Sequence, residues 1–215
     1  MKSKIDISSL VFKGVIFFLI VGLISCKREV SVQDFLNHVN TDKDFVKKYA
    51  DDIFHAQCVY NPPQVMALTE LRGTLEQQGR IDSTQFNKAL KSFSGASYFS
   101  FKLGLTDSND IFKKDIRSRE EYVYRINDIE FNMGKHAYFL TQNRDTVRAS
   151  IFDMQRSYGM SQDLTMIFAF PSERLLQENS TVNFVYDDIY FGLSHPLVFS
   201  FDPKQLKKKL PEIQL

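Results

Sequence analysis

The residues best suited to nucleophilic chemistry are a serine and a histidine next to each other, Ser194 and His195, in Gly192-Leu193-Ser194-His195-Pro196. A serine hydroxyl attacks acyl groups when a histidine removes its proton, as in many hydrolases. Neighbouring side chains on an extended chain point to opposite sides, so the sequence predicts no bond between these two. Glycine, serine and proline are also typical of turns. The segment is therefore interpreted as a loop between strands.

The second candidate nucleophile is Cys58, which lies three residues after His55. Phe54, Ala56, Cys58 and Tyr60 recur at every second position and therefore share one face of a strand. His55 then points away from the sulfur. The pattern predicts a buried, inert thiol.

Metal and nucleotide motifs are missing from the sequence. No H-E-x-x-H, Walker loop, G-x-G-x-x-G or G-x-S-x-G is present. Asp107 and Asn109 have the spacing of calcium ligands, but the glycine and glutamate of an EF-hand are missing, so a turn or helix cap is expected. Asp187 and Asp188 are neighbours on a predicted strand and should face opposite sides. The sequence therefore predicts no catalytic residue, metal or cofactor. An enzyme remains the alternative, as a hydrolase whose active-site residues come from distant loops. His136 and His195 are the histidines that could take part.

The composition is that of a soluble globular protein of one domain. The chain has 215 residues, 43% hydrophobic and 25% charged, with a formal net charge of +1. This balance does not favour binding to nucleic acid. The chain has 20 phenylalanines and no tryptophan. Those on predicted strands are interpreted as core, and the alternative is a cavity for an apolar ligand. They are Phe99, Phe101, Phe168, Phe170, Phe184, Phe199 and Phe201.

The N-terminus has the organisation of a secretory signal. Lysines precede an apolar run over 14–24, and the segment closes on Leu23-Ile24-Ser25-Cys26. This tetrad resembles the lipobox of bacterial lipoproteins, although Asp6 departs from the usual basic start. The resemblance implies a signal peptide over 1–25, cleavage after Ser25 and a diacylglycerol on Cys26. It also implies membrane lipid as a partner and acyl groups such as palmitate.

A lipoprotein would consist of one α+β domain over 26–215, held in the cell envelope. Without Lys2, Lys4, Lys13 and Asp6 its formal charge becomes −1, so attraction to anionic lipid is not expected. Lys27 follows the cysteine, and we expect the outer membrane, facing the periplasm. The body resembles uncharacterised lipoproteins of Bacteroidota, a group that implies no activity.

Two short motifs resemble the O-glycosylation acceptors of Bacteroidota, Asp82-Ser83-Thr84 and Asp145-Thr146-Val147. They make Ser83 and Thr146 candidate acceptors, although Asp82 is equally explained as a helix cap. The run of lysines over 207–209 is interpreted as the solvated side of a final helix.

Helical periodicity dominates the first part of the chain after the signal. Apolar residues from Val32 to Val39 predict a helix capped by Ser31, and a second helix is expected over about 42–53. Further helices are expected over 63–72, ended by Gly73, over 83–92 and over 118–126.

Strands are expected over 54–60, 98–105, 129–133, 136–142, 146–155, 163–170, 181–191 and 197–201. Turns are expected at 143–145 and at Gly159. The run over 164–170 is apolar at nearly every position, which favours an interior strand. The fold class predicted is α+β, with N-terminal helices packed on a mainly antiparallel C-terminal sheet, a meander. The expected function is a non-catalytic binding or structural module, with an apolar ligand, a glycan or an envelope protein as partner.

Overall fold

A computed structural model describes residues 29–155, 161–177 and 180–215. It is an α+β fold whose two main sheets are antiparallel, so the predicted class is confirmed. The signal segment, Cys26 and the turn expected at Gly159 lie outside the described residues. Among the described residues, no helix combines the length and the apolar character needed to cross a bilayer.

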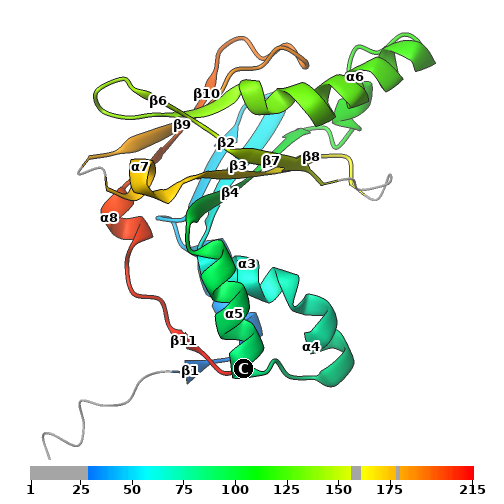
Figure 1. The fold of residues 1–215 in the computed structure, drawn as a ribbon. Coiled ribbons are helices and arrows are strands. Elements are labelled where there is room, and N and C mark those ends of the chain that lie inside the picture. Colours follow the sequence, from blue (N-terminus) through cyan, green and yellow to red (C-terminus); the bar gives the residue numbers. More distant parts are fainter. Residues whose placement is uncertain (1–28, 156–160, 178–179) are drawn as a thin grey trace, which may run out of the picture.

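The larger sheet has five strands, with β4 at its centre (Figure 1). Its order is β2 (Val46–Ala50), β3 (Phe54–Asn61), β4 (Ala96–Leu105), β8 (Leu164–Pro171) and β7 (Ile151–Met154). The alternation predicted for β4 is confirmed, because Phe99, Phe101 and Leu103 are fully buried while Lys102 is exposed. The apolar strand β8 lies between β4 and β7, so its predicted interior place is also confirmed.

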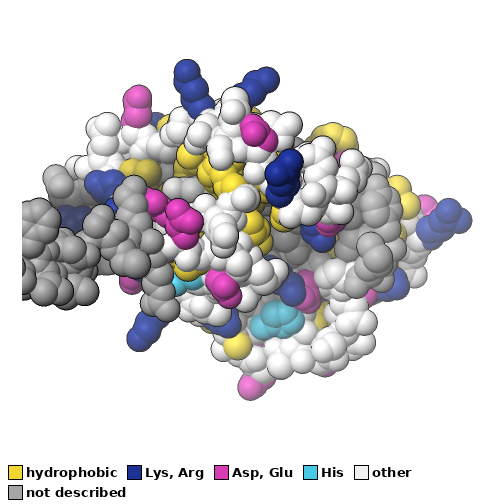
Figure 2. Space-filling model, turned by 90° about the horizontal axis from the view of Figure 1, so that it is seen from below, with side chains coloured by type: hydrophobic (Ala, Val, Ile, Leu, Met, Phe, Trp, Pro, Cys, Tyr) yellow, Lys and Arg dark blue, Asp and Glu magenta, His cyan; other side chains and the backbone are white. Residues whose placement is uncertain are grey.

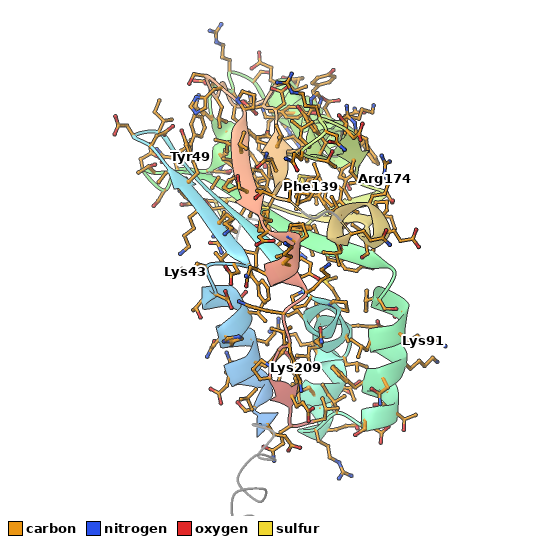
Figure 3. The ribbon with its side chains drawn as sticks, turned by 90° about the vertical axis from the view of Figure 1, so that its left-hand side faces the viewer. Lys43, Tyr49, Lys91, Phe139, Arg174 and Lys209 are labelled. Atoms are coloured by element: carbon orange, nitrogen blue, oxygen red, sulfur yellow. The ribbon has the colours of Figure 1, made fainter. Side chains whose placement is uncertain are left out.

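The smaller sheet covers the apolar face of the larger one. Its order is β10 (Leu197–Phe201), β9 (Val182–Tyr186), β5 (Ala137–Leu140) and β6 (Thr146–Arg148). Phenylalanine rings fill the space between the sheets. Phe139 lies 4.8 Å from Phe99 and 4.8 Å from Phe170 between ring centroids (Figure 3). The seven phenylalanines interpreted as strand core are all buried, so that interpretation is confirmed.

The path of the chain is more complex than a simple meander. The hairpin predicted at 143–145 joins β5 to β6, and Arg144 has a positive φ of 65° there. The strand expected over 146–155 is divided into β6 and β7, which belong to different sheets. Ala149 and Ser150 carry the chain from one sheet to the other. In addition, β9 pairs with β5 rather than with the preceding β8.

Four helices gather at one end of the sandwich, below the sheets in Figure 1. They are α2 (Val32–Thr41), α3 (Pro63–Glu70), α4 (Arg72–Gln78) and α5 (Ser83–Phe93). The predicted caps are confirmed: Ser31 accepts a hydrogen bond from the amide of Asp34, and Asp82 accepts from two amides of α5. At the same end, β1 (Glu29–Val30) pairs in parallel with β11 (Glu212–Ile213).

The remaining helical segments lie elsewhere on the sandwich. The longest of them, α6, crosses the opposite end from β1 (Figure 1). These segments are α6 (Arg119–Asn132), α7 (Ser172–Leu176), α8 (Pro203–Leu206) and the 3₁₀ turns η1 (Ile111–Lys113) and η2 (Met133–Lys135).

Three predicted elements are wrong. The helix expected over 42–53 is replaced by β2, because the turn at Asp51 folds this segment into a hairpin with β3, and cross-strand pairing overrides local periodicity. The strand expected over 129–133 continues α6 and then enters η2; five residues are too few to separate the two periods. Gly73 does not end a helix but lies inside α4, which ends at Gly79 with a φ of 70°.

Candidate functional site

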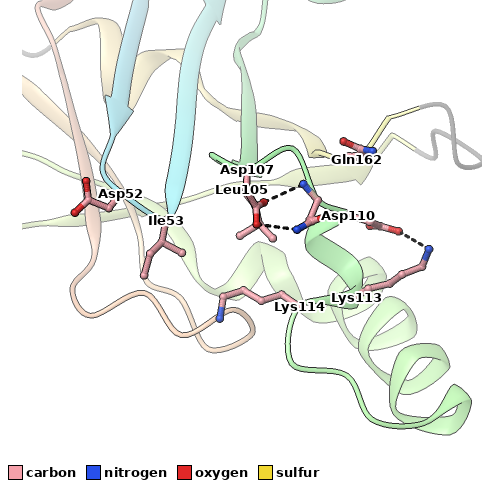
Figure 4. A pocket seen from close by; sticks show the side chains of 9 residues that line it. Asp52, Ile53, Leu105, Asp107, Asp110, Lys113, Lys114 and Gln162 are labelled. Carbon is pink, nitrogen blue, oxygen red and sulfur yellow. Dashed lines mark hydrogen bonds and ion pairs between the residues drawn. The ribbon is translucent and has the colours of Figure 1, made fainter.

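A cleft of about 640 Å³ opens at the end of the sandwich that is remote from β1 (Figure 4). It forms where the β2–β3 turn meets the loop after β4. Its lining contains three carboxylates, two lysines, two amides and two apolar side chains: Asp52, Asp107, Asp110, Lys113, Lys114, Asn109, Gln162, Ile53 and Leu105.

The loop after β4 holds its carboxylates by local hydrogen bonds. The amide and side-chain nitrogens of Asn109 donate to Asp107 at 3.0 and 2.7 Å. Asp110 accepts from the amide of Phe112 and lies 3.3 Å from Lys113. The turn or cap expected of Asp107 and Asn109 is therefore confirmed.

The two sides of the cleft differ in how firmly their side chains are held. Lys114 lies 2.5 Å from Asp115, with its ammonium 5.6 Å from the centre of the Phe54 ring. On the other side, Asp52 and Ile53 project from the β2–β3 turn, and Ile53 is 55% exposed. The cleft therefore offers fixed donors and acceptors beside an accessible apolar side chain.

A second polar cluster adjoins the cleft at the same turn. The Asp51 carboxylate accepts from the amides of Ile53 and Phe54 at 2.8 and 2.7 Å, and from the Tyr49 hydroxyl at 2.5 Å. The bond from Tyr49 and the two amide bonds lower the pKa of Asp51, and the bond to Asp51 raises the pKa of Tyr49. These bonds explain the tight turn between β2 and β3.

The prediction that Ser194 and His195 would not bond each other is wrong. Ser194 Oγ lies 3.0 Å from His195 Nδ1. Both residues lie in the β9–β10 loop after Gly192, whose φ is 79°, so the alternation of an extended chain does not apply. Both side chains are exposed. The His195 ring lies edge-on to Tyr49, 6.1 Å between centroids.

Asp188 organises this loop, a role that the sequence did not suggest. Its carboxylate accepts from the amides of Tyr190, Phe191 and Leu193, each at 3.0 Å, and from the Tyr186 hydroxyl at 2.8 Å. The strand expected over 181–191 ends at Tyr186, so Asp188 lies in a turn. The available signal was an aspartate four residues before Gly192, because aspartate side chains accept hydrogen bonds from the amides that follow them in turns.

The prediction for Cys58 is confirmed. The thiol is fully buried, and burial raises its pKa well above the ordinary value. His55 faces the other side of the sheet, 3.4 Å from Asp163, which also lies 2.7 Å from Lys102. Asp163 and His55 lie over Gly104, where an added Cβ would be 2.0 Å from the Asp163 carboxylate. Because the Cys58 thiol is buried and His55 lies on the other face of the sheet, the thiol has a structural role.

The remaining predicted residues lie apart from the cleft. Ser83 begins α5 and Thr146 begins β6, and both are exposed. Lys208 is not a solvated lysine, because its ammonium lies 2.6 Å from Asp42 and 2.7 Å from Asp44. The expected final helix is limited to α8, which ends at Leu206. In the described part of the chain, no group of three potential ligands is arranged to hold a metal.

Comparisons with known proteins give no functional assignment. No family model matches the sequence, and no curated protein matches it. A protein of unknown function from Burkholderia pseudomallei has a similar structure with a TM-score of 0.40 and 7% sequence identity. The match covers 85% of this chain and 95% of that one. A similarity of this size carries no argument about function.

Proposed function

We propose that the protein is a lipid-anchored, non-catalytic binding module of the bacterial envelope, with its ligand in the cleft beside Asp52. The observation that carries the proposal is the lining of that cleft, which combines acceptors, donors and exposed Ile53. The anchor is the lipobox cysteine, Cys26, and we place the protein at the outer membrane, facing the periplasm.

The short segment between Cys26 and β1 supports a fixed orientation of the domain relative to the membrane. Cys26 lies three residues before β1, so its lipid can lie at most about 10 Å from β1. The end formed by α2 to α5 would then face the bilayer. This end carries charges of both signs among apolar side chains (Figure 2). The cleft lies at the other end, where a periplasmic ligand can reach it.

The lining favours a neutral, hydroxyl-bearing ligand, and we propose a glycan. Planar carboxylate and amide groups bind pairs of hydroxyls, and an exposed apolar side chain packs on the C–H face of a sugar. An apolar ligand inside the sandwich is disfavoured, because Phe99, Phe139 and Phe184 are fully buried in mutual ring contact.

The ligand is tested on an array of soluble bacterial oligosaccharides, including muropeptides. We expect at least one glycan to bind the wild-type chain, and Asp52→Ala to reduce that binding at least tenfold. Glu70→Ala, an exposed change on α3, serves as the matched control and should bind normally. Equal binding by both variants, or no glycan bound, would contradict the proposed ligand.

The anchor is tested separately by mass spectrometry. The mature chain should begin at Cys26 and exceed its polypeptide mass by the attached acyl groups, whereas Cys26→Ser should lose that added mass. Membrane binding of the wild type should also resist high salt, because burial of acyl chains is not screened by ions. An intact Met1, or an unmodified Cys26, would contradict the lipoprotein proposal.

A hydrolase remains the alternative, favoured by the 3.0 Å contact between Ser194 and His195. The exposure of Ser194 and His195 argues against a hydrolase, because activated serines work in sites that exclude water. A fluorophosphonate probe decides between the two. We expect no labelling of the wild type. Labelling that Ser194→Ala abolishes and Ser200→Ala retains would favour the hydrolase.

A further inference from the structure

The helix α6 presents two large aromatic side chains to solvent. Tyr124 is 74% exposed and Phe131 is 69% exposed. They are seven residues apart, which places them on the same face of the helix. Of the 14 residues of α6, only Ile129 is buried. This face therefore lacks a partner within the described chain.

The charges around these aromatics form a symmetric pattern. Glu120 lies four residues before Tyr124, and Lys135, at the end of η2, lies four residues after Phe131. Asn127 lies between the two aromatics on the same face. All three of these polar residues are exposed. From residue 135 back to residue 120, the order is again charged, aromatic, aromatic, charged, with the same spacing. Only the signs of the two charges are exchanged.

This pattern is complementary to itself in an antiparallel pair. With a two-fold axis close to residues 127 and 128, each Tyr124 faces the partner's Phe131. Each Glu120 then lies opposite the partner's η2 turn, which directly follows α6 and carries Lys135. Every contact then occurs twice, as in an isologous interface. The reverse, parallel arrangement in register would place Glu120 against the partner's Glu120 and would be repelled.

We propose that two copies of this chain associate through antiparallel pairing of α6. A contact between two helix faces is smaller than a standard interface of about 1,600 Å², so the dimer is expected to be reversible. The aromatic pairs supply most of the affinity, and the charge pairs select the antiparallel direction.

The test is disulfide trapping of the full chain in intact cells treated with a membrane-permeant thiol oxidant, so that the result does not depend on the compartment. Asn127→Cys places a thiol close to the two-fold axis, within the reach of its copy. Lys91→Cys, an exposed position on α5 far from α6, is the matched control (Figure 3). We expect at least five times more trapped dimer for Asn127→Cys. The native cysteines, Cys26 and Cys58, are common to both variants. Equal trapping would overturn the proposal.

Charge reversal then tests the direction of pairing. In the Asn127→Cys chain, Glu120→Lys or Lys135→Glu alone should reduce the trapped fraction at least fivefold, and Tyr124→Ser at least tenfold. Together, Glu120→Lys and Lys135→Glu should restore it. Variants that merely fold poorly would not recover in the double variant. Failure of the double variant to recover would overturn the antiparallel pairing, and neither result depends on the anchor or on the glycan.

Discussion

The sandwich and the helical end of this molecule are stabilised in different ways. Between the sheets, rings such as Phe99, Phe139 and Phe184 form one continuous aromatic core. At the helical end, α4 has no buried residue, and α5 buries only Phe86 and Ala89 as core residues. The sandwich is held by dense aromatic packing. The helical end buries smaller groups of apolar residues, such as Phe35 of α2 and Leu68 of α3, and adds caps, ion pairs and the short β1–β11 pairing.

The two regions are therefore expected to differ in the free energy of local opening. A dense aromatic core transmits and resists strain, while a segment with few buried contacts opens at lower free energy. The sandwich therefore gives the β2–β3 turn and the β9–β10 loop a rigid base. The helical end is the part best able to adjust to a bilayer or another surface next to β1.

The largest expected effect concerns the aromatic core. Phe168 is fully buried, with its ring 5.7 Å from Phe184 and 6.2 Å from Phe170 between centroids. Phe168→Ala should lower the free energy of unfolding by about 3–5 kcal/mol in denaturant titration, because it leaves a cavity between the sheets. Phe131→Ala, at an exposed phenylalanine, should change it by less than about 0.5 kcal/mol. A loss below about 1 kcal/mol for Phe168→Ala would remove the contrast between the two regions.

A smaller effect is expected where the C-terminal tail is fastened to the helical end. Lys208 bonds Asp42 directly after α2 and Asp44 before β2. Burial raises the pKa of Asp42, but the bonds from Lys208 and from the amide of Asp44 outweigh it, so the pKa is lowered overall. The Lys208 pKa is raised, since these carboxylates outweigh its own burial.

Lys208→Met should therefore cost about 1–2 kcal/mol at neutral pH, and Lys209→Met, at an exposed lysine, close to nothing. A lowered carboxyl pKa gives stability that is complete above the unfolded value of about 4 and lost as the pH falls through the folded value. The difference between wild type and Lys208→Met should thus shrink in acid. A difference that stays constant from pH 7 to pH 3 would show that the ion pair does not fasten the tail.

The smallest expected effect is a gain of stability in α4. An added Cβ at Gly73 meets nothing within 4 Å, so Gly73→Ala should stabilise the helical end by about 0.5–1 kcal/mol. Gly79→Ala should instead destabilise it by about 1 kcal/mol, because Gly79 has a φ of 70°. Hydrogen exchange of the α4 amides measures both changes. If both substitutions slowed exchange, or both accelerated it, then Gly73 and Gly79 would not differ as an interior and a C-cap glycine, and the assigned end of α4 would be wrong.

The sequence alone determined those features that depend on neighbours along the chain. The alternation of Phe99, Phe101 and Leu103 made β4 recognisable, because a half-buried strand has a period of two. Asp82 and Ser31 were identifiable as caps, because capping bonds reach only two or three residues. The buried, unreactive state of Cys58 followed from the same alternation. The lipidation of Cys26 rests on sequence resemblance alone.

Only the tertiary structure decided which strands pair and which loops meet. Pairing with β3, which is itself held by β4 in the larger sheet, made a strand of 46–50 despite its helical periodicity. The segment at Ala149 and Ser150 divided one predicted strand between two sheets. The cleft could not be predicted, since Asp52, Asp107 and Gln162 are far apart in sequence and are joined by strand pairing. Likewise, the contact of Ser194 with His195 depends on a loop that Asp188 folds through bonds to three amides. Local periodicity contains no information on such contacts, because their free energy comes from groups that meet only after the chain has folded.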